Sequence, residues 1–386
     1  MRPISRGRPH ASGTITRALA VTALFGVALP LVVTSCGNGS PVTSMRGPTA
    51  GTLVSVGRMT VGRSLHTATL LPTGEVLLAG GGTPELPATV SVEIFDPRTG
   101  LTRTTGDLKV AREEHTATLL PDGTVLLVGG PDSAANSAEI YDPTSGSSTL
   151  VGPLTEPRSD HVAVLLDNGR VLILGGDTSR VGATPTAGAE LYDPVTRTFT
   201  PTGRMSIPRV PFGVVRLPDG RILVAGGTTT EKQVVASAEI YDPGMGQFIS
   251  TGTLLTTRRK HAGALLSQGT VLIMGGTTDR SDSTVLHSTE SFDPATGHFQ
   301  PSAPMRFPRF KFAAVSLLDG SILVAGGSEE TVEVFDLRTG QFMAVANGEQ
   351  GLRLFPTATL LADGSVLIAG GYSGNGSQAT LWRYSR

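Results

Sequence analysis

The stretch DGTVLLVGG at residues 122–130 recurs in seven closely similar copies along the chain. The copies are TGEVLLAGG (73–81), DGTVLLVGG (122–130), NGRVLILGG (168–176), DGRILVAGG (219–227), QGTVLIMGG (268–276), DGSILVAGG (319–327) and DGSVLIAGG (363–371). In each copy a turn residue and a glycine precede a short apolar run, which is the pattern of a β-strand leaving a tight hairpin. An internal repeat of this length predicts one supersecondary unit per copy rather than seven separate domains.

Each repeat predicts four antiparallel strands. The first is an apolar run such as that starting at His115, and a two-residue turn ending in glycine closes it. The second is the VLxxGG run, which is apolar on both faces, as in a strand that lies between two neighbouring sheets. The third carries Glu-x-Tyr/Phe-Asp-Pro, as at 93–97 and 239–243, and the fourth is short, as at 198–202. The chain is therefore expected to be all-β.

The last repeat ends at Arg386 after its third strand. Residues 51–59, which precede the first repeat, align with the fourth-strand segments of the other units, for example 197–205. We therefore predict a seven-bladed β-propeller over 51–386, closed by an N-terminal strand that completes the last blade. Closure of this kind protects strand edges that would otherwise be open.

The repeat resembles the kelch repeat, and in particular the type found in the central domain of galactose oxidase, over 51–386. Those oxidases bind copper through Tyr and His residues at the starts of inner strands, and they use a cysteine cross-linked to a tyrosine. Here the inner-strand starts hold His, Phe or Pro, and the only cysteine is Cys36. The resemblance therefore implies the fold without the copper radical chemistry, and we expect no cofactor.

The N-terminus predicts export. Residues 1–17 are basic and contain no acid, and residues 18–35 are apolar, so 1–35 is expected to be a signal peptide. The tetrapeptide Val33-Thr34-Ser35-Cys36 resembles the lipobox of bacterial lipoproteins, which implies a diacylglycerol on Cys36. Residues 36–50 would then be the lipidated cysteine and a flexible tether. The predicted location is the cell envelope, with the membrane as a partner through the lipid anchor.

Two other interpretations of this segment stay open. One is a cleaved signal with an incidental cysteine, and the other is an uncleaved anchor of 18 apolar residues interrupted by Pro30.

The charge balance argues against nucleic acid as a partner. The chain has 31 basic and 32 acidic residues, a net charge of -1. Removal of residues 1–35, which contain four arginines, leaves 27 basic residues and a net charge of -5. Nucleic-acid binding needs a basic face. We expect a monomer.

Two charged residues recur in register and predict a structural ring. An arginine precedes the first strand of every repeat, and a glutamate begins the third strand of six. They are Arg63, Arg112, Arg158, Arg209, Arg258, Arg309 and Arg353, with Glu93, Glu139, Glu190, Glu239, Glu290 and Glu333. An anion-binding ring is the alternative, but a residue needed once per blade with a carboxylate available is better explained as an internal ion pair.

The remaining candidate ligand-binding residues are histidines and loop residues. His66, His115, His161 and His261 follow four of the arginines by three residues. They could bind a ligand or a metal, but an equivalent residue in several blades favours a structural hydrogen bond. The loops between strands two and three vary, and from them we select Asp177, Arg180 and Tyr372. These features share the face of the disc formed by the two-to-three and four-to-one connections, near the mouth of the central channel.

The favoured function is a binding module at the cell envelope that recognises a protein or a glycan. The alternative is a carbohydrate-active enzyme of the sugar isomerase or epimerase kind, which would use His with Glu or Arg at the channel mouth. We assign no catalytic residue and no metal ligand, and a purely structural role in the envelope stays open.

Overall fold

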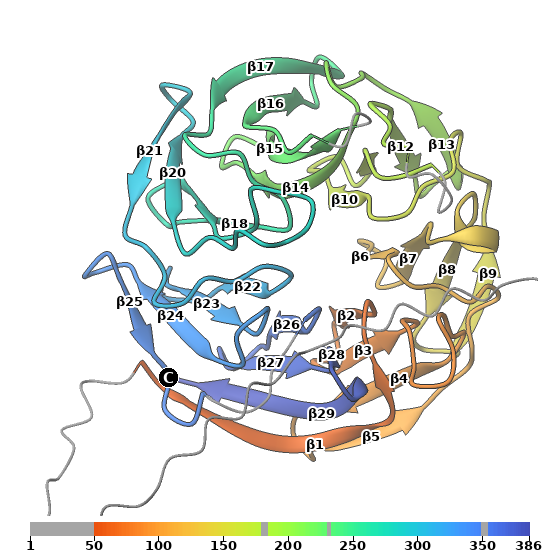
Figure 1. The fold of residues 1–386 in the computed structure, drawn as a ribbon. Coiled ribbons are helices and arrows are strands. Elements are labelled where there is room, and N and C mark those ends of the chain that lie inside the picture. The colour runs from red at the N-terminus through yellow and green to blue at the C-terminus, as the bar shows by residue number, and fades with distance from the viewer. Residues whose placement is uncertain (1–49, 179–183, 230–232, 349–353) are drawn as a thin grey trace, which may run out of the picture. The chain divides into compact units, whose positions relative to one another are not determined.

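The structure is a computed structural model that describes residues 50–178, 184–229, 233–348 and 354–386. These residues form seven antiparallel sheets arranged in a ring (Figure 1). The seven-bladed propeller and its four-stranded blades are thus confirmed. The predicted signal peptide, Cys36 and the predicted tether up to residue 49 lie outside the described residues. Among the described residues, no helix is long and apolar enough to cross a membrane.

The blades follow one another along the chain, and within blades 1 to 6 the strands run outward in sequence order. Blades 1 to 3 are β2 (Thr67–Leu70), β3 (Val76–Ala79), β4 (Val92–Asp96), β5 (Leu101–Thr104); β6 (Thr116–Leu119), β7 (Val125–Val128), β8 (Ala138–Asp142), β9 (Ser147–Leu150); and β10 (Val162–Leu165), β11 (Val171–Leu174), β12 (Ala189–Asp193), β13 (Thr198–Pro201). Blades 4 to 6 are β14 (Arg209–Arg216), β15 (Ile222–Thr229), β16 (Ser237–Asp242), β17 (Gln247–Thr253); β18 (Ala262–Leu265), β19 (Val271–Met274), β20 (Thr289–Asp293), β21 (His298–Ser302); and β22 (Ala313–Ser316), β23 (Ile322–Ala325), β24 (Val332–Asp336), β25 (Gln341–Ala344).

Blade 7 joins the two ends of the chain, as predicted. Its strand order is β26 (Thr357–Leu360), β27 (Val366–Ala369), β29 (Gly376–Ser385) and β1 (Thr52–Arg63). The orange-red β1 lies alongside the blue β29 in Figure 1, and the two strands pair antiparallel from Thr52↔Ser385 to Arg58↔Thr380. A short additional strand, β28 (Tyr372–Ser373), pairs with β29. The last blade therefore takes its outer strand from the start of the described chain.

The hydrophobic core lies between the blades. Seven clusters of buried residues each combine side chains from two adjacent blades, for example Val128 of blade 2 with Ile173 of blade 3. Every residue of the second strands, such as Val125–Val128, is buried. The VLxxGG runs are apolar on both faces because a neighbouring blade covers each face.

The hairpins between first and second strands differ from the predicted two-residue turn. In blade 2 the Leu120 N–H donates to the Thr124 carbonyl at 2.8 Å, and the Gly123 N–H donates to the Leu120 carbonyl at 3.0 Å. The loop therefore has three residues, and Gly123 takes the left-handed position with φ +85°. A tight turn followed by a left-handed glycine is the usual three-residue hairpin, so the glycine was identified correctly but the loop was one residue too short.

Candidate functional site

The six described arginines of the predicted ring are buried, with at most 1% of each exposed. Each one forms an ion pair with the glutamate of its own blade at 2.5 to 2.8 Å. The pairs are Arg63–Glu93, Arg112–Glu139, Arg158–Glu190, Arg209–Glu239, Arg258–Glu290 and Arg309–Glu333. Arg353 lies outside the described residues.

Blade 2 shows what each pair does. Arg112 donates to Glu139 at 2.7 Å, to the Gly129 carbonyl at 2.8 Å and to the Ser137 carbonyl at 3.0 Å. The second oxygen of Glu139 accepts the backbone N–H of Lys109 at 2.6 Å. Burial lowers the pKa of Arg112, and Glu139 opposes this effect. The pair thus joins the double-glycine end of strand two to strand three and to the connection entering the blade, so this arginine does not face a ligand.

The histidines join neighbouring blades. The Nε2 atoms of His66, His115 and His161 lie 3.3, 3.1 and 2.9 Å from a threonine hydroxyl of the preceding blade, on Thr357, Thr67 and Thr116 respectively. Burial, followed by the nearby arginine, lowers the pKa of His66 and of His161 to about 3. These rings are therefore neutral over the physiological range, and they hold blades together.

His261 lies where this pattern is interrupted. The position that holds threonine in blades 1, 2 and 7 is Gly213 in blade 4, and a Cβ there would come within 2.4 Å of the His261 Nε2. The ring instead lies beside Phe212, with centroids 6.1 Å apart. Burial lowers the pKa of His261 to about 3. Among the described residues, no group of three or more His, Cys, Asp or Glu side chains is placed to hold a metal ion.

A second set of residues encircles the channel mouth, and the sequence interpretation missed it. Each member directly precedes the His, Phe or Pro that starts an inner strand, and each has a left-handed backbone with φ between +49° and +59°. We call these the entrance residues: Leu65, Glu114, Asp160, Lys260, Lys311 and Phe355. In blade 4, where β-bulges flank Phe212, Pro211 takes the equivalent position.

Backbone hydrogen bonds link the entrance residues from blade to blade. The Glu114 N–H donates to the Leu65 carbonyl and the Asp160 N–H to the Glu114 carbonyl, both at 3.2 Å. On the other side the Lys311 N–H donates to the Lys260 carbonyl at 3.1 Å, and the Phe355 N–H donates to the Lys311 carbonyl at 2.8 Å. The backbone of this ring is held by hydrogen bonds while its side chains vary among the blades, which is the arrangement expected of a recognition surface.

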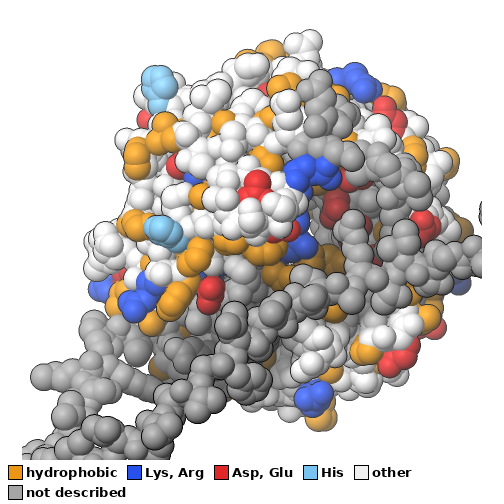
Figure 2. Space-filling view, viewed as in Figure 1, with side chains coloured by type: hydrophobic (Ala, Val, Ile, Leu, Met, Phe, Trp, Pro, Cys, Tyr) orange, Lys and Arg blue, Asp and Glu red, His pale blue; other side chains and the backbone are white. Residues whose placement is uncertain are grey.

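The entrance residues line a cavity of about 540 Å³ together with Pro211, Phe212, Phe312 and the four histidines. Figure 2 shows the hollow near the centre of this face, with acidic and basic side chains close to it. A cavity of this size is within the range of small-ligand sites. The sequence did mark these positions, because each lies directly before the His, Phe or Pro that starts an inner strand. The residue types at these positions vary, however, so no motif singled them out. Only the closed ring brings them together.

The charges of the cavity are separated by blade. Glu114 and Asp160 come from blades 2 and 3, whereas Lys260 and Lys311 come from blades 5 and 6. Asp160 is exposed to the cavity, but the protein around it removes enough water to raise its pKa, and Lys311 and Lys260 oppose this effect. The Lys260 ammonium is 2.5 Å from Asp282.

Lys311 lies in a different environment from Lys260. Its ammonium is 4.4 Å from the Phe355 ring centroid, and no carboxylate of the described residues pairs with it. Burial, followed by repulsion from Lys260, lowers the pKa of Lys311 to about 8. The cavity therefore contains a half-buried cation that is still largely charged at neutral pH.

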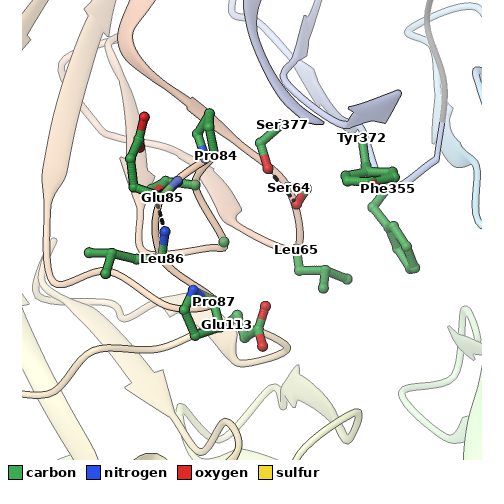
Figure 3. Close-up of a pocket in the computed structure, with 12 residues that line it drawn as sticks. Ser64, Leu65, Pro84, Glu85, Leu86, Pro87, Glu113, Phe355, Tyr372 and Ser377 are labelled. Atoms are coloured by element: carbon green, nitrogen blue, oxygen red, sulfur yellow. Dashed lines mark hydrogen bonds between the residues drawn. The ribbon is translucent and has the colours of Figure 1, made fainter. Parts of the chain in front are cut away.

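A second cavity, of about 410 Å³, adjoins the first and shares Leu65 and Phe355 with it. Pro84, Leu86 and Pro87 line one side, and Tyr372 and Phe355 line the other (Figure 3). We call this cavity the apolar well. Leu86 is 54% exposed and Tyr372 45% exposed. Tyr372 was predicted to bind a ligand, and the structure places it at this well rather than at the channel mouth.

Asp177, another predicted binding residue, lines a small hollow of about 100 Å³ that shares Asp160, Phe212 and Lys260 with the main cavity. Its Oδ1 atom is buried and has no hydrogen-bond partner among the residues that the structure describes. Burial, followed by repulsion from Asp160, raises the pKa of Asp177 to about 6. Arg180 lies outside the described residues. The three hollows adjoin one another through shared lining residues, and together we call them the depression.

Comparisons with known proteins agree with this architecture. The family model of the kelch motif matches residues 258–306. Among solved structures, a fungal alcohol oxidase of the AA5 family, in complex with copper, matches with a TM-score of 0.69 and 19% sequence identity. The match covers 87% of this chain and 76% of that one. At this identity the likeness shows the fold alone. The comparison with curated proteins found no match.

The described residues do not fit the copper site of such oxidases. Tyr141, Tyr192 and Tyr241 are fully buried in third strands. The histidines at the inner-strand starts are buried between blades. A Tyr and His ligand set at the channel mouth is therefore not formed by these side chains.

Proposed function

We propose that this kelch-repeat β-propeller is a binding module that takes a protein or glycan ligand at the mouth of its central channel. One observation carries the proposal: residues that differ from blade to blade converge on a cavity of about 540 Å³. The residues that repeat in every blade are engaged within the scaffold. Side chains that vary on a rigid frame are typical of recognition sites.

The lining of the cavity suits recognition. It combines aromatic rings of Phe212, Phe312 and Phe355 with the charged groups of Asp160 and Lys311. Apolar surface contributes most of the affinity in such sites, and a few placed polar groups determine specificity.

A sugar isomerase or epimerase is the less favoured alternative. Such an enzyme needs an acid and a base within hydrogen-bond reach of a substrate. Of the proposed participants, Glu139 is paired with Arg112, and His115 bonds Thr67 with its pKa well below 6.5. The same arrangement recurs in other blades, so these residues do not supply the acid–base pair.

We further propose that the module is exported and held at the bacterial cell envelope by a lipid on Cys36. The support is the basic start, the apolar run and the lipobox-like tetrapeptide at 33–36. A Cys36→Ser variant should lose incorporation of labelled fatty acid and move to the soluble fraction. Retention of label would contradict the assignment.

The binding function is tested with the purified full-length chain on a glycan array and against a displayed peptide library. Asp160→Asn and Lys311→Met alter the cavity, and the exposed Lys109→Met serves as the control. We expect ligands whose binding is weakened at least tenfold by a cavity variant and is unchanged in the control. If neither Asp160→Asn nor Lys311→Met changes the affinity for the ligand, the channel mouth is excluded as the binding site.

A further inference from the structure

We propose that the ligand is an extended peptide segment that places an apolar side chain in the apolar well and a carboxylate on Lys311. This inference rests on the proposed binding function and specifies its ligand. Its basis is the continuity of the two cavities through Leu65 and Phe355, together with their different chemistry.

The serine and threonine hydroxyls of the apolar well are already engaged in hydrogen bonds within the protein. The hydroxyls of Ser64 and Ser377 lie 3.0 Å apart and bond each other (Figure 3). The Thr83 hydroxyl accepts the N–H groups of Glu85 and Leu86 at 3.3 and 3.0 Å. A sugar would bring several hydroxyl groups into a site whose serine and threonine hydroxyls are already engaged, and unpaired polar groups are costly to bury. An aliphatic or aromatic side chain meets no such cost.

The surface of the well is formed by short apolar side chains on one side and rings on the other. Pro84, Leu86 and Pro87 come from the loop between β3 and β4, and Tyr372 and Phe355 come from blade 7. An apolar side chain held between these two sides would remove Leu86 and Tyr372 from water. Burial of such a side chain is favourable by roughly 1.5–3 kcal/mol.

The charges decide where the carboxylate of the peptide goes. The carboxylate of Glu85 lines the well, so a further negative charge there would be repelled. Lys311 lies over the Phe355 ring in the adjoining cavity, half-buried and without a salt bridge among the described residues. An acidic group next to Lys311 would replace water at a partly desolvated cation, where an ion pair is stronger than at an open surface.

The geometry also sets the spacing within the peptide. The Lys311 ammonium is 4.4 Å from the centroid of Phe355, whose ring borders the well. An extended chain advances roughly 3.3 Å per residue. The acid is therefore expected one or two residues from the apolar side chain, as Asp, Glu or the C-terminal carboxylate.

The test uses the full-length chain purified in detergent and a phage library of random 12-residue peptides. We expect enrichment of peptides with an apolar residue within two positions of an acid. For one fluorescein-labelled enriched peptide, Lys311→Met should weaken binding at least tenfold, and Leu86→Ser should weaken it several-fold. The matched controls Lys109→Met and Leu101→Ser, both exposed and outside the cavities, should leave affinity unchanged.

A thermodynamic cycle separates direct contact from a structural effect. Replacing the peptide's acid by its amide should cost the same factor as Lys311→Met and should cost nothing further in that variant. No enrichment of acids, or additive losses in the cycle, would overturn the proposal. If no peptide is enriched but glycans on an array bind through Lys311, the ligand class is wrong and the binding function stands. If neither the peptide library nor the glycan array yields a ligand whose affinity changes in the cavity variants, both the proposed binding function and the proposed peptide ligand are wrong.

Discussion

Replacing Glu139 by Gln tests whether the buried ion pairs stabilise the propeller. Neither side chain of the Arg112–Glu139 pair is exposed. One oxygen of Glu139 accepts from Arg112 at 2.7 Å, and the other accepts from the Lys109 N–H at 2.6 Å and the Ser148 hydroxyl at 2.5 Å. The substitution leaves Arg112 buried without a carboxylate partner. It also gives residue 139 an NH₂ group in a place where the neighbouring groups are themselves donors.

Breaking a buried ion pair from one side costs about 3–5 kcal/mol. The described residues belong to a compact unit of about 340 residues. The usual entropy of unfolding, about 2.1 cal/mol/K per residue, gives roughly 0.7 kcal/mol/K for a domain of this size. Glu139→Gln should therefore lower Tm by about 4–7 °C, which is measured by calorimetry.

The control is Glu75→Gln, because Glu75 pairs with Arg103 at 3.0 Å on the surface. An exposed pair contributes about 0–1 kcal/mol, so this Tm should fall by roughly 1 °C or less. Combining Glu139→Gln with Arg112→Met removes the unpaired charge and should recover part of the loss. Equal shifts for the buried and exposed glutamates, or full additivity in the double variant, would refute the assigned role.

Three further predictions follow from single positions. Leu53→Asp, at a site 2% exposed in β1, should lower the free energy of unfolding by several kcal/mol, whereas the neighbouring Val54→Asp, at 48% exposure, should change it little; similar urea midpoints for the two would disprove the closing role of β1. His161 has its pKa lowered to about 3, so unfolding takes up a proton between pH 6.5 and 3 and stability falls as pH drops through that range; His161→Gln should flatten this slope by up to about 1.4 kcal/mol per pH unit in urea titrations, and an unchanged slope would show that the ring titrates normally. Lys311 has its pKa lowered to about 8, so it is a cation below that pH; affinity for the acidic peptide should decrease from pH 7 to 9 in the native chain, and a matching decrease in Lys311→Met would assign the titration to another group.

The fold could be predicted from the sequence because its determinants are local and repeated. Val125–Val128 and its six counterparts follow the same turn glycine, and each run has to be covered on both faces. Residues 51–59 matched a fourth strand in composition and spacing, and they occupy the place that the last repeat left empty. The exact length of the hairpin was not readable, because it depends on backbone angles around Gly123 rather than on residue type.

The candidate site could be predicted only in part. The sequence pointed to the face of the disc on which the depression lies and selected Tyr372 and Asp177, both of which border the depression. It did not select Asp160 or Lys311, because each belongs to a position that changes from blade to blade and so leaves no repeated pattern.

The sequence by itself determined the number of blades, the order of their strands and the residue types of the scaffold, since these depend on short-range patterns and on turn glycines. The tertiary structure alone decided that Glu114 and Lys311, almost 200 residues apart in the chain, line one cavity. That proximity arises because β1 closes the ring and brings every inner-strand start to a common axis. Because the closure of all seven blades brings Glu114 and Lys311 to one cavity, no pattern within a single repeat could have predicted that they lie near each other.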